Sequence, residues 1–173
     1  DAFTVKVTGN ILQATLVSLA SKIAKSNVEI TLDLSETQGL VAISPASRYT
    51  SVFKDCKKLV SVVFPSSLTT IGSDAFYDCD GLTYITLGSN VTIVGDYAFS
   101  GCKSLASITI SASVANIGNR AFDSCTGLKK VEINCASVEK WFSGLPSIQE
   151  IVLGNDVRKI GSYAFQNCTG LTS

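Results

Sequence analysis

Cysteine is the residue type in this sequence best suited to chemistry, because a thiolate can attack a substrate, bind a metal ion or form a disulfide. The chain holds six cysteines in 173 residues. Five share one spacing: Cys56, Cys79, Cys102, Cys125 and Cys168. The first four lie 23 residues apart, and Leu145 takes the equivalent place before the last. This regularity indicates a repeated structural unit, in which we expect buried, unbridged thiols acting as small apolar side chains.

The composition argues against an enzyme. The sequence has no histidine, which removes Ser-His-Asp and Cys-His catalysis and histidine-ligated zinc. It has no C-x-x-C pair and no G-x-x-x-x-G-K-[ST] phosphate loop. The 14 basic and 14 acidic residues cancel, so no overall basic field exists for nucleic acid. We therefore expect no catalytic residue, no metal, no cofactor and no nucleic-acid partner.

Six consecutive units share one register, and each begins with phenylalanine. Units one to six are residues 53–75, 76–98, 99–121, 122–141, 142–164 and the incomplete 165–173. Units one, two, three and five have 23 residues, whereas unit four has 20. One unit cannot bury its apolar side alone, so we expect the units to stack around one continuous core.

Each unit contains the pattern L-x-x-I-x-I, for example Leu105, Ile108 and Ile110. Apolar residues at alternate positions over a short run predict a β-strand. A V-x-x-I-G segment follows, and its regularly placed glycine predicts a backbone bend at Gly72, Gly95, Gly118 and Gly161. The A-F-x-x-C stretch predicts one helical or 3₁₀ turn that buries its Ala, Phe and Cys side chains.

Unit four contains two irregular residues. Cys135 lies outside the regular spacing, just past a predicted strand, and its thiol is either exposed and reactive or tucked beneath the turn. Trp141 stands where other units have alanine, and its indole either fills the space left by the shorter unit or protrudes as a contact. We favour burial for both side chains, because free cysteine and tryptophan are usually mostly buried.

The combination of L-x-x-I-x-I with I-G-x-x-A-F-x-x-C resembles the leucine-rich repeats of the BspA-like class, also called the Treponema pallidum type. The resemblance covers 53–173 strongly and 28–52 weakly, where Leu32 and Leu34 start a first unit with an insertion over 44–52. It implies an α/β leucine-rich-repeat solenoid with a parallel concave β-sheet and short helical or 3₁₀ turns on the convex side. It also implies an adhesive bacterial protein that is extracellular, on the cell surface or periplasmic.

We assign residues 1–27 to an N-terminal cap and 28–173 to the solenoid. The cap begins with a predicted strand whose alternating apolar residues are Phe3, Val5 and Val7. A helix to about residue 26 follows, with Thr8 or Asn10 as its N-cap. Its apolar face is formed by Leu12, Leu16, Leu19 and Ile23. We expect this helix to cover the first repeat; a membrane-surface helix is less favoured because few basic residues flank this face.

The C-terminal end shows no cap, since the chain stops at the start of unit six. We expect the sequence, which also lacks an initial methionine, to be a piece of a larger or processed protein. The unpaired edge of the last strand, about 149–153, predicts edge-mediated self-association. No run of 18 apolar residues occurs, so we expect no transmembrane segment.

Residues between the inward-pointing aliphatic positions are expected to face outward on the concave sheet. The first outward column is Thr31, Ser61, Tyr84, Ser107, Lys130 and Glu150. The second outward column is Asp33, Val63, Thr86, Thr109, Glu132 and Val152. We expect Val63, Pro65 and Tyr84 to form an apolar patch. Beside it we expect a charged patch formed by Lys130, Glu132 and Glu150. The candidate binding residues are Val63, Tyr84, Thr86, Ser107, Thr109, Lys130, Glu132 and Glu150.

The leading interpretation is a non-catalytic binding or adhesion module that presents its concave sheet to a protein or glycan partner of host or matrix origin. Two alternatives stay open. One is a carrier of a small apolar ligand at the Val63 and Tyr84 patch, and the other is a structural, self-associating spacer. The serine and threonine residues of the face are equally compatible with ordinary solvent-exposed strand positions.

Overall fold

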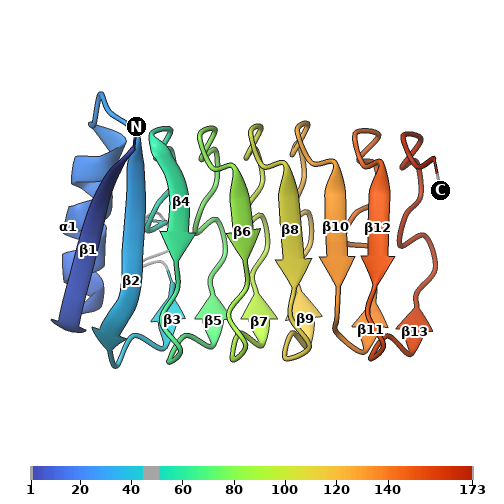
Figure 1. The fold of residues 1–173 in the computed structure, drawn as a ribbon, viewed down its shortest axis with the longest axis horizontal. Helices are drawn as coiled ribbons and strands as arrows, with labels where there is room; N and C mark the ends of the chain where they lie inside the picture. The colour runs from blue at the N-terminus through green and yellow to red at the C-terminus, as the bar shows by residue number, and fades with distance from the viewer. Residues whose placement is uncertain (1, 45–50, 173) are drawn as a thin grey trace.

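The computed structural model describes residues 2–44 and 51–172. Successive units of the chain stack side by side along the long axis, with the N-terminus at one end and the C-terminus at the other (Figure 1). The parallel strands and the stacking confirm the predicted leucine-rich-repeat solenoid. Most of the insertion expected over 44–52 lies outside the described residues.

One strand of each unit faces the viewer in Figure 1, and a helix closes the N-terminal end. These strands are β1 (Phe3–Asn10), β2 (Ile30–Gln38), β4 (Leu59–Val63), β6 (Tyr84–Thr86), β8 (Ser107–Ile110), β10 (Lys130–Ile133) and β12 (Glu150–Leu153). The helix α1 is Gln13–Ala24. The strands pair in parallel as two sheets, β1-β2-β4 and β6-β8-β10-β12. Strand β1 therefore extends the sheet by one strand beyond the six that the repeats predict.

A second set of parallel strands lies further along each unit. It comprises β3 (Ala42–Ile43), β5 (Thr70–Ile71), β7 (Ile93–Val94), β9 (Asn116–Ile117), β11 (Ser137–Val138) and β13 (Lys159–Ile160). They pair as β3-β5-β7-β9 and β11-β13, so the described ladder is interrupted between β9 and β11. Each has two residues, too few for an alternating pattern to reveal it in the sequence.

A ladder of phenylalanine rings runs through the core. The rings of Phe53, Phe76, Phe99, Phe122 and Phe142 are fully buried. Neighbouring rings in this series stack with centroids 5.2–5.7 Å apart. The ring of Phe165 continues the stack at 6.4 Å and is only partly buried. The repeat register deduced from the phenylalanines is therefore correct.

The turns that carry these rings are single turns, as predicted. At the start of unit two, the amide of Tyr77 donates to the carbonyl of Asp74 in unit one at 3.1 Å, and the amide of Leu82 donates to the carbonyl of Cys79 at 3.0 Å. Left-handed residues interrupt the turns, and those just before the repeated Cys or Leu145 are Asp55, Asp78, Gly101, Ser124, Gly144 and Asn167. The amides of Asp55, Asp78, Gly101 and Gly144 donate to carbonyls of the next unit, for example Asp78 to Ser100 at 2.8 Å.

The repeated glycines allow close packing between units. None of the glycines at positions 72, 95, 118 and 161 has a left-handed φ. A Cβ on Gly95 would clash with the backbone of Ser73, and one on Gly118 would clash with that of Asp96. A left-handed φ is therefore not the reason for glycine here; at Gly95 and Gly118, the neighbouring turn approaches too closely for a side chain.

The cap differs from the prediction at its helix start. Thr8 and Asn10 do not cap α1, because they belong to β1 and pair with β2. Leu12 is the N-cap residue, with no side-chain cap bond, and its side chain is 74% exposed. The buried face of α1 is formed by Leu16, Ala20 and Ile23, which covers the core as expected. No helix in the described part of the chain is long and apolar enough to span a membrane.

The regularly spaced cysteines are buried and free, as predicted, but they do more than fill space. The thiol of Cys79 donates to the carbonyl of Phe53 at 2.9 Å, and that of Cys102 donates to Phe76 at 3.2 Å. The thiols of Cys125 and Cys168 repeat this contact. Each thiol thus joins its own unit to an earlier one through the phenylalanine turn. Leu145 is also buried at this position, but its side chain has no donor for a hydrogen bond to a phenylalanine carbonyl.

Candidate binding surfaces

The outward side of β2, β4, β6, β8, β10 and β12, which we call the sheet face, contains the predicted binding residues. From β6 to β12 the first column runs in register through Tyr84, Ser107, Lys130 and Glu150. The second column runs through Thr86, Thr109, Glu132 and Val152. Parallel pairing without a register shift brings these side chains together, because side chains at equivalent positions point to the same face.

The exposure of the candidate residues varies along the sheet face. Exposed members are Val63, Tyr84, Thr86, Lys130 and Glu150, whereas Ser107, Thr109 and Glu132 are half-buried. Tyr84 is the largest exposed side chain among the eight, with 54% of its surface accessible. An aromatic side chain with this exposure is suited to anchor a partner.

The predicted apolar patch is smaller than expected. Pro65 is buried and Ser61 is also buried, although both were placed on the outward side. Val63 pairs with Asp33 of β2 and belongs to the sheet β1-β2-β4, not to the sheet of Tyr84. Val63 and Tyr84 thus lie on either side of an interruption between β4 and β6.

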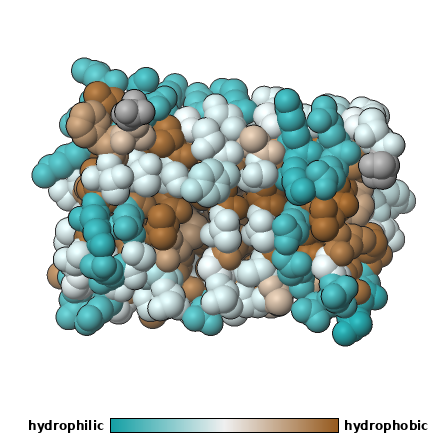
Figure 2. All heavy atoms as spheres, viewed as in Figure 1, coloured by the Kyte–Doolittle hydropathy of each residue, from teal (hydrophilic) through white to brown (hydrophobic). Residues whose placement is uncertain are grey.

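Charged residues gather on the C-terminal half of the sheet face, where Figure 2 shows hydrophilic side chains over β10 and β12. The ammonium of Lys130 pairs with the carboxylate of Glu150 at 2.9 Å, and the amide of Asn134 donates to Glu132 at 3.2 Å. The pair is half-exposed, so its stabilising contribution is small. In general, fixed charges on a surface select a partner of complementary charge.

The thiols are unsuited to reactions at neutral pH. Burial raises the pKa of Cys56 and Cys125 to about 12 and the pKa of Cys79 and Cys102 well above the usual range. Cys135 is buried, as favoured, and burial raises its pKa too. Among the described residues, no group of three or more His, Cys, Asp or Glu is placed to hold a metal ion.

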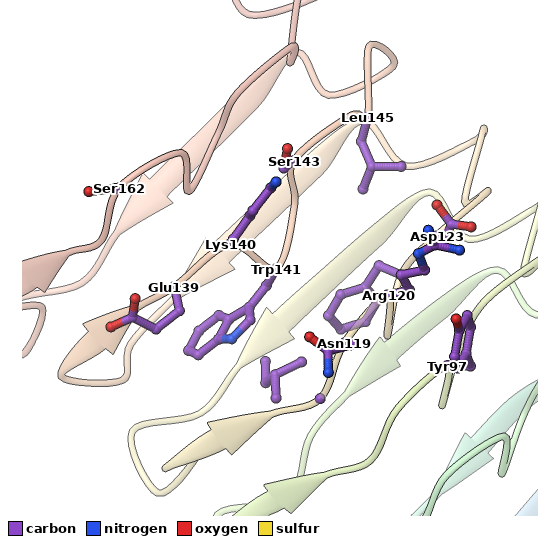
Figure 3. A pocket seen from close by; sticks show the side chains of 13 residues that line it. Tyr97, Asn119, Arg120, Asp123, Glu139, Lys140, Trp141, Ser143, Leu145 and Ser162 are labelled. Carbon is purple, nitrogen blue, oxygen red and sulfur yellow. The ribbon is translucent and has the colours of Figure 1, made fainter.

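A groove of about 750 Å³, which we call the seam groove, opens beside the shortened unit four, away from the sheet face. Its walls include Asn119, Arg120, Asp123, Glu139, Lys140 and Trp141 (Figure 3). Trp141 is buried, with 9% exposed, so the favoured packing is confirmed, yet its indole forms part of the wall. Sequence reasoning noted the shorter unit but missed the groove, although the three-residue deficit was a usable signal.

The described residues form a second groove, of about 290 Å³, against α1. Neither this groove nor the seam groove is lined by Val63 or Tyr84. An exposed patch without a concave pocket would bury little of a small ligand. The geometry therefore offers no support for a small apolar ligand at that patch.

The repeat pattern decides the family. The BspA type leucine rich repeat region matches residues 47–172 in six copies. The chain belongs to this family. Its family and fold are those of protein-binding repeat modules, which are generally non-catalytic scaffolds. No functionally curated protein matches the chain in sequence.

Solved structures of bacterial leucine-rich repeat proteins share this fold. A leucine-rich repeat protein from Bacteroides ovatus is 32% identical, with a TM-score of 0.68 over 82% of this chain and 35% of that one. A leucine rich cell surface protein from Faecalibacterium prausnitzii is 28% identical, with a TM-score of 0.62 over 71% of this chain and 31% of that one. These matches span about a third of those longer chains.

The Treponema pallidum leucine rich repeat protein matches 99% of this chain and 79% of its own, with a TM-score of 0.69. Its identity of 23% supports the shared fold alone. The first two comparisons and the family match together support a protein-binding repeat module of the BspA type.

Proposed function

We propose that this chain is a non-catalytic, cell-surface or secreted adhesion module that binds a partner protein on its sheet face. The observation that carries the proposal is the in-register array of outward side chains from β6 to β12. Stacked units hold this array on rigid strands, which limits the entropy lost on binding. The cell-surface description of one structural relative supports the location.

A protein partner fits the chemistry of the sheet face. Tyr84 supplies an exposed aromatic anchor, and the hydroxyl-bearing residues Thr86, Ser107 and Thr109 lie near it on β6 and β8. The paired Lys130 and Glu150 lie at the far end of the first column. An anchor surrounded by polar groups is the usual anatomy of a protein interface.

A binding array of extracellular matrix and host surface proteins, with glycans included as a second class, tests this proposal. We expect the wild-type chain to bind at least one protein, and Tyr84→Ala to weaken that binding about 30-fold or more, as for an interface hot spot. Glu132→Lys reverses one charge of the second column and should also weaken it. Equal binding by the wild type and both variants would refute the site.

Tyr163→Ala provides the matched control. Tyr163 is 65% exposed but lies outside both outward columns, so its removal should leave binding unchanged. Uptake of an apolar probe that Tyr84→Ala abolishes would instead favour the small-ligand carrier. Failure to bind any protein or glycan would favour the structural spacer.

A further inference from the structure

The seam groove arises from the shortened unit. Three residues separate Val138 from Phe142, whereas four separate Ile117 from Phe122 in unit three. Regular units are joined by bonds such as the amide of Gly118 to the carbonyl of Val94, at 2.8 Å. Unit four has Glu139 in place of that glycine, and β9 and β11 do not pair in the described structure. The turns on either side separate, while the core rings of Phe122 and Phe142 remain stacked.

Three polar side chains of unit three and the start of unit four line the groove without internal partners. Within the described residues, Asn119, Arg120 and Asp123 make no side-chain hydrogen bond or ion pair, and all three are exposed. On the opposite wall, Glu139 accepts from Lys159 at 3.0 Å and Lys140 lies 5.9 Å from the ring of Tyr163. The first wall is therefore available to a ligand.

The chemistry of the walls selects against charged and apolar ligands. Arg120 and Lys140 balance Asp123 and Glu139, so the groove carries no net charge from its side chains. An ionic ligand would meet like charges, and an apolar ligand would leave the polar groups without partners. A ligand rich in hydroxyl groups satisfies both walls, since each hydroxyl donates and accepts.

We propose that the seam groove binds one or two neutral sugar residues of a glycan. Asn119, Arg120 and Asp123 would bond to the sugar hydroxyls, and the small exposed part of the Trp141 indole would contact the C–H groups of the sugar. The volume of about 750 Å³ lies in the range of ligand sites. An extended peptide fits less well, because it gains affinity by pairing along a strand edge, and β9 and β11 offer two residues each. This site does not depend on the function proposed for the sheet face.

Neutral monosaccharides and disaccharides test the proposal, with glucose, galactose, mannose and N-acetylglucosamine as probes. Saturation-transfer NMR on the full chain detects binding, and the fluorescence of Trp141, the single tryptophan, reports its location. We expect saturable binding of at least one probe with a change in that fluorescence. Asn119→Ala and Asp123→Ala should each weaken it about tenfold or more, the loss for a hydrogen bond to a polar or charged partner.

Gln166→Ala is the matched control, because Gln166 is exposed and stands at the place in unit six that Asp123 has in unit four. Its binding should equal that of the wild type, and all variants should melt at the wild-type temperature. Three results would overturn the proposal: no neutral sugar binds, an acidic sugar or a peptide binds in its place, or Asp123→Ala binds as tightly as Gln166→Ala.

Discussion

At the residue scale, the buried Phe and Cys columns hold the units together in different ways. The Phe99 ring lies between those of Phe76 and Phe122, with centroid distances of 5.3 and 5.7 Å. The thiols add a hydrogen bond from one unit to an earlier one, as Cys102 does to Phe76. Both columns act across unit boundaries, so the stability of each unit depends on its neighbours.

Replacing Phe99 with alanine removes one ring from the middle of the ladder. We expect the free energy of unfolding to fall by about 3–5 kcal/mol, because a buried cavity replaces a large side chain. Thermal and denaturant unfolding measure this loss. An unchanged melting temperature would contradict the repeat register.

The buried thiols predict a loss of stability at alkaline pH. Their folded-state pKa is raised by burial, so the neutral thiols stabilise the fold below the unfolded value of about 8.5, and this contribution is lost as the pH rises toward 12. In that window, the unfolding free energy of Cys102→Ala should fall less steeply with rising pH than that of the wild type, by about 1.4 kcal/mol per pH unit. Parallel curves for the wild type and this variant would contradict the prediction.

At the element scale, the turns that carry the phenylalanine rings share one feature. A residue with a left-handed φ precedes the repeated Cys or Leu145 in every unit. Gly101 and Gly144 occupy one such position in units three and five, whereas Ser124 holds it in unit four with φ of 58°. A side chain in this conformation is strained relative to glycine. Glycine and serine thus occupy the same structural position in different units of this chain.

Ser124→Gly should therefore stabilise the protein. We expect a gain of about 1 kcal/mol, the relief of left-handed strain minus the greater flexibility of unfolded glycine. The same substitution at Ser89, which is exposed and has no left-handed φ, should instead lower the melting temperature. A decrease of equal size for both variants would show that strain is absent at Ser124.

The sequence predicted the elements best where a pattern repeats. The strand positions, the ring ladder and the buried Cys column followed from spacing, because each unit supports the same assignment. The helix start at Leu12 was missed, since pairing of β1 with β2 extends through Asn10 and overrides the capping preference. The seam groove was missed because it arises from how two unequal turns pack, which no single residue encodes.

At the scale of the whole molecule, the solenoid offers two distinct surfaces. The sheet face depends on units that stack in register, which aligns the two outward columns from Tyr84 to Glu150. The seam groove depends on the one unit that departs from the register. Regular repeats thus build an extended surface, and an irregular unit adds a localised cavity.

The last strands carry exposed apolar side chains, including Leu153 and Ile160. For the 173-residue polypeptide, association of two or more copies through the unpaired edge of β12 therefore remains a prediction. Light scattering should show a mass above 18.2 kDa that grows with concentration. A monomer throughout the accessible range would count against it.

Binding through the sheet face is the central claim, and blocking that face tests it most directly. Thr86→Arg places a bulky side chain in the second column, whereas Ser73→Arg places one in an exposed turn outside the sheet face. The affinity of each variant for the captured partner protein is then compared with that of the wild type. We predict a loss of at least about tenfold for Thr86→Arg and none for Ser73→Arg. Equal affinities for the two variants would contradict the claim.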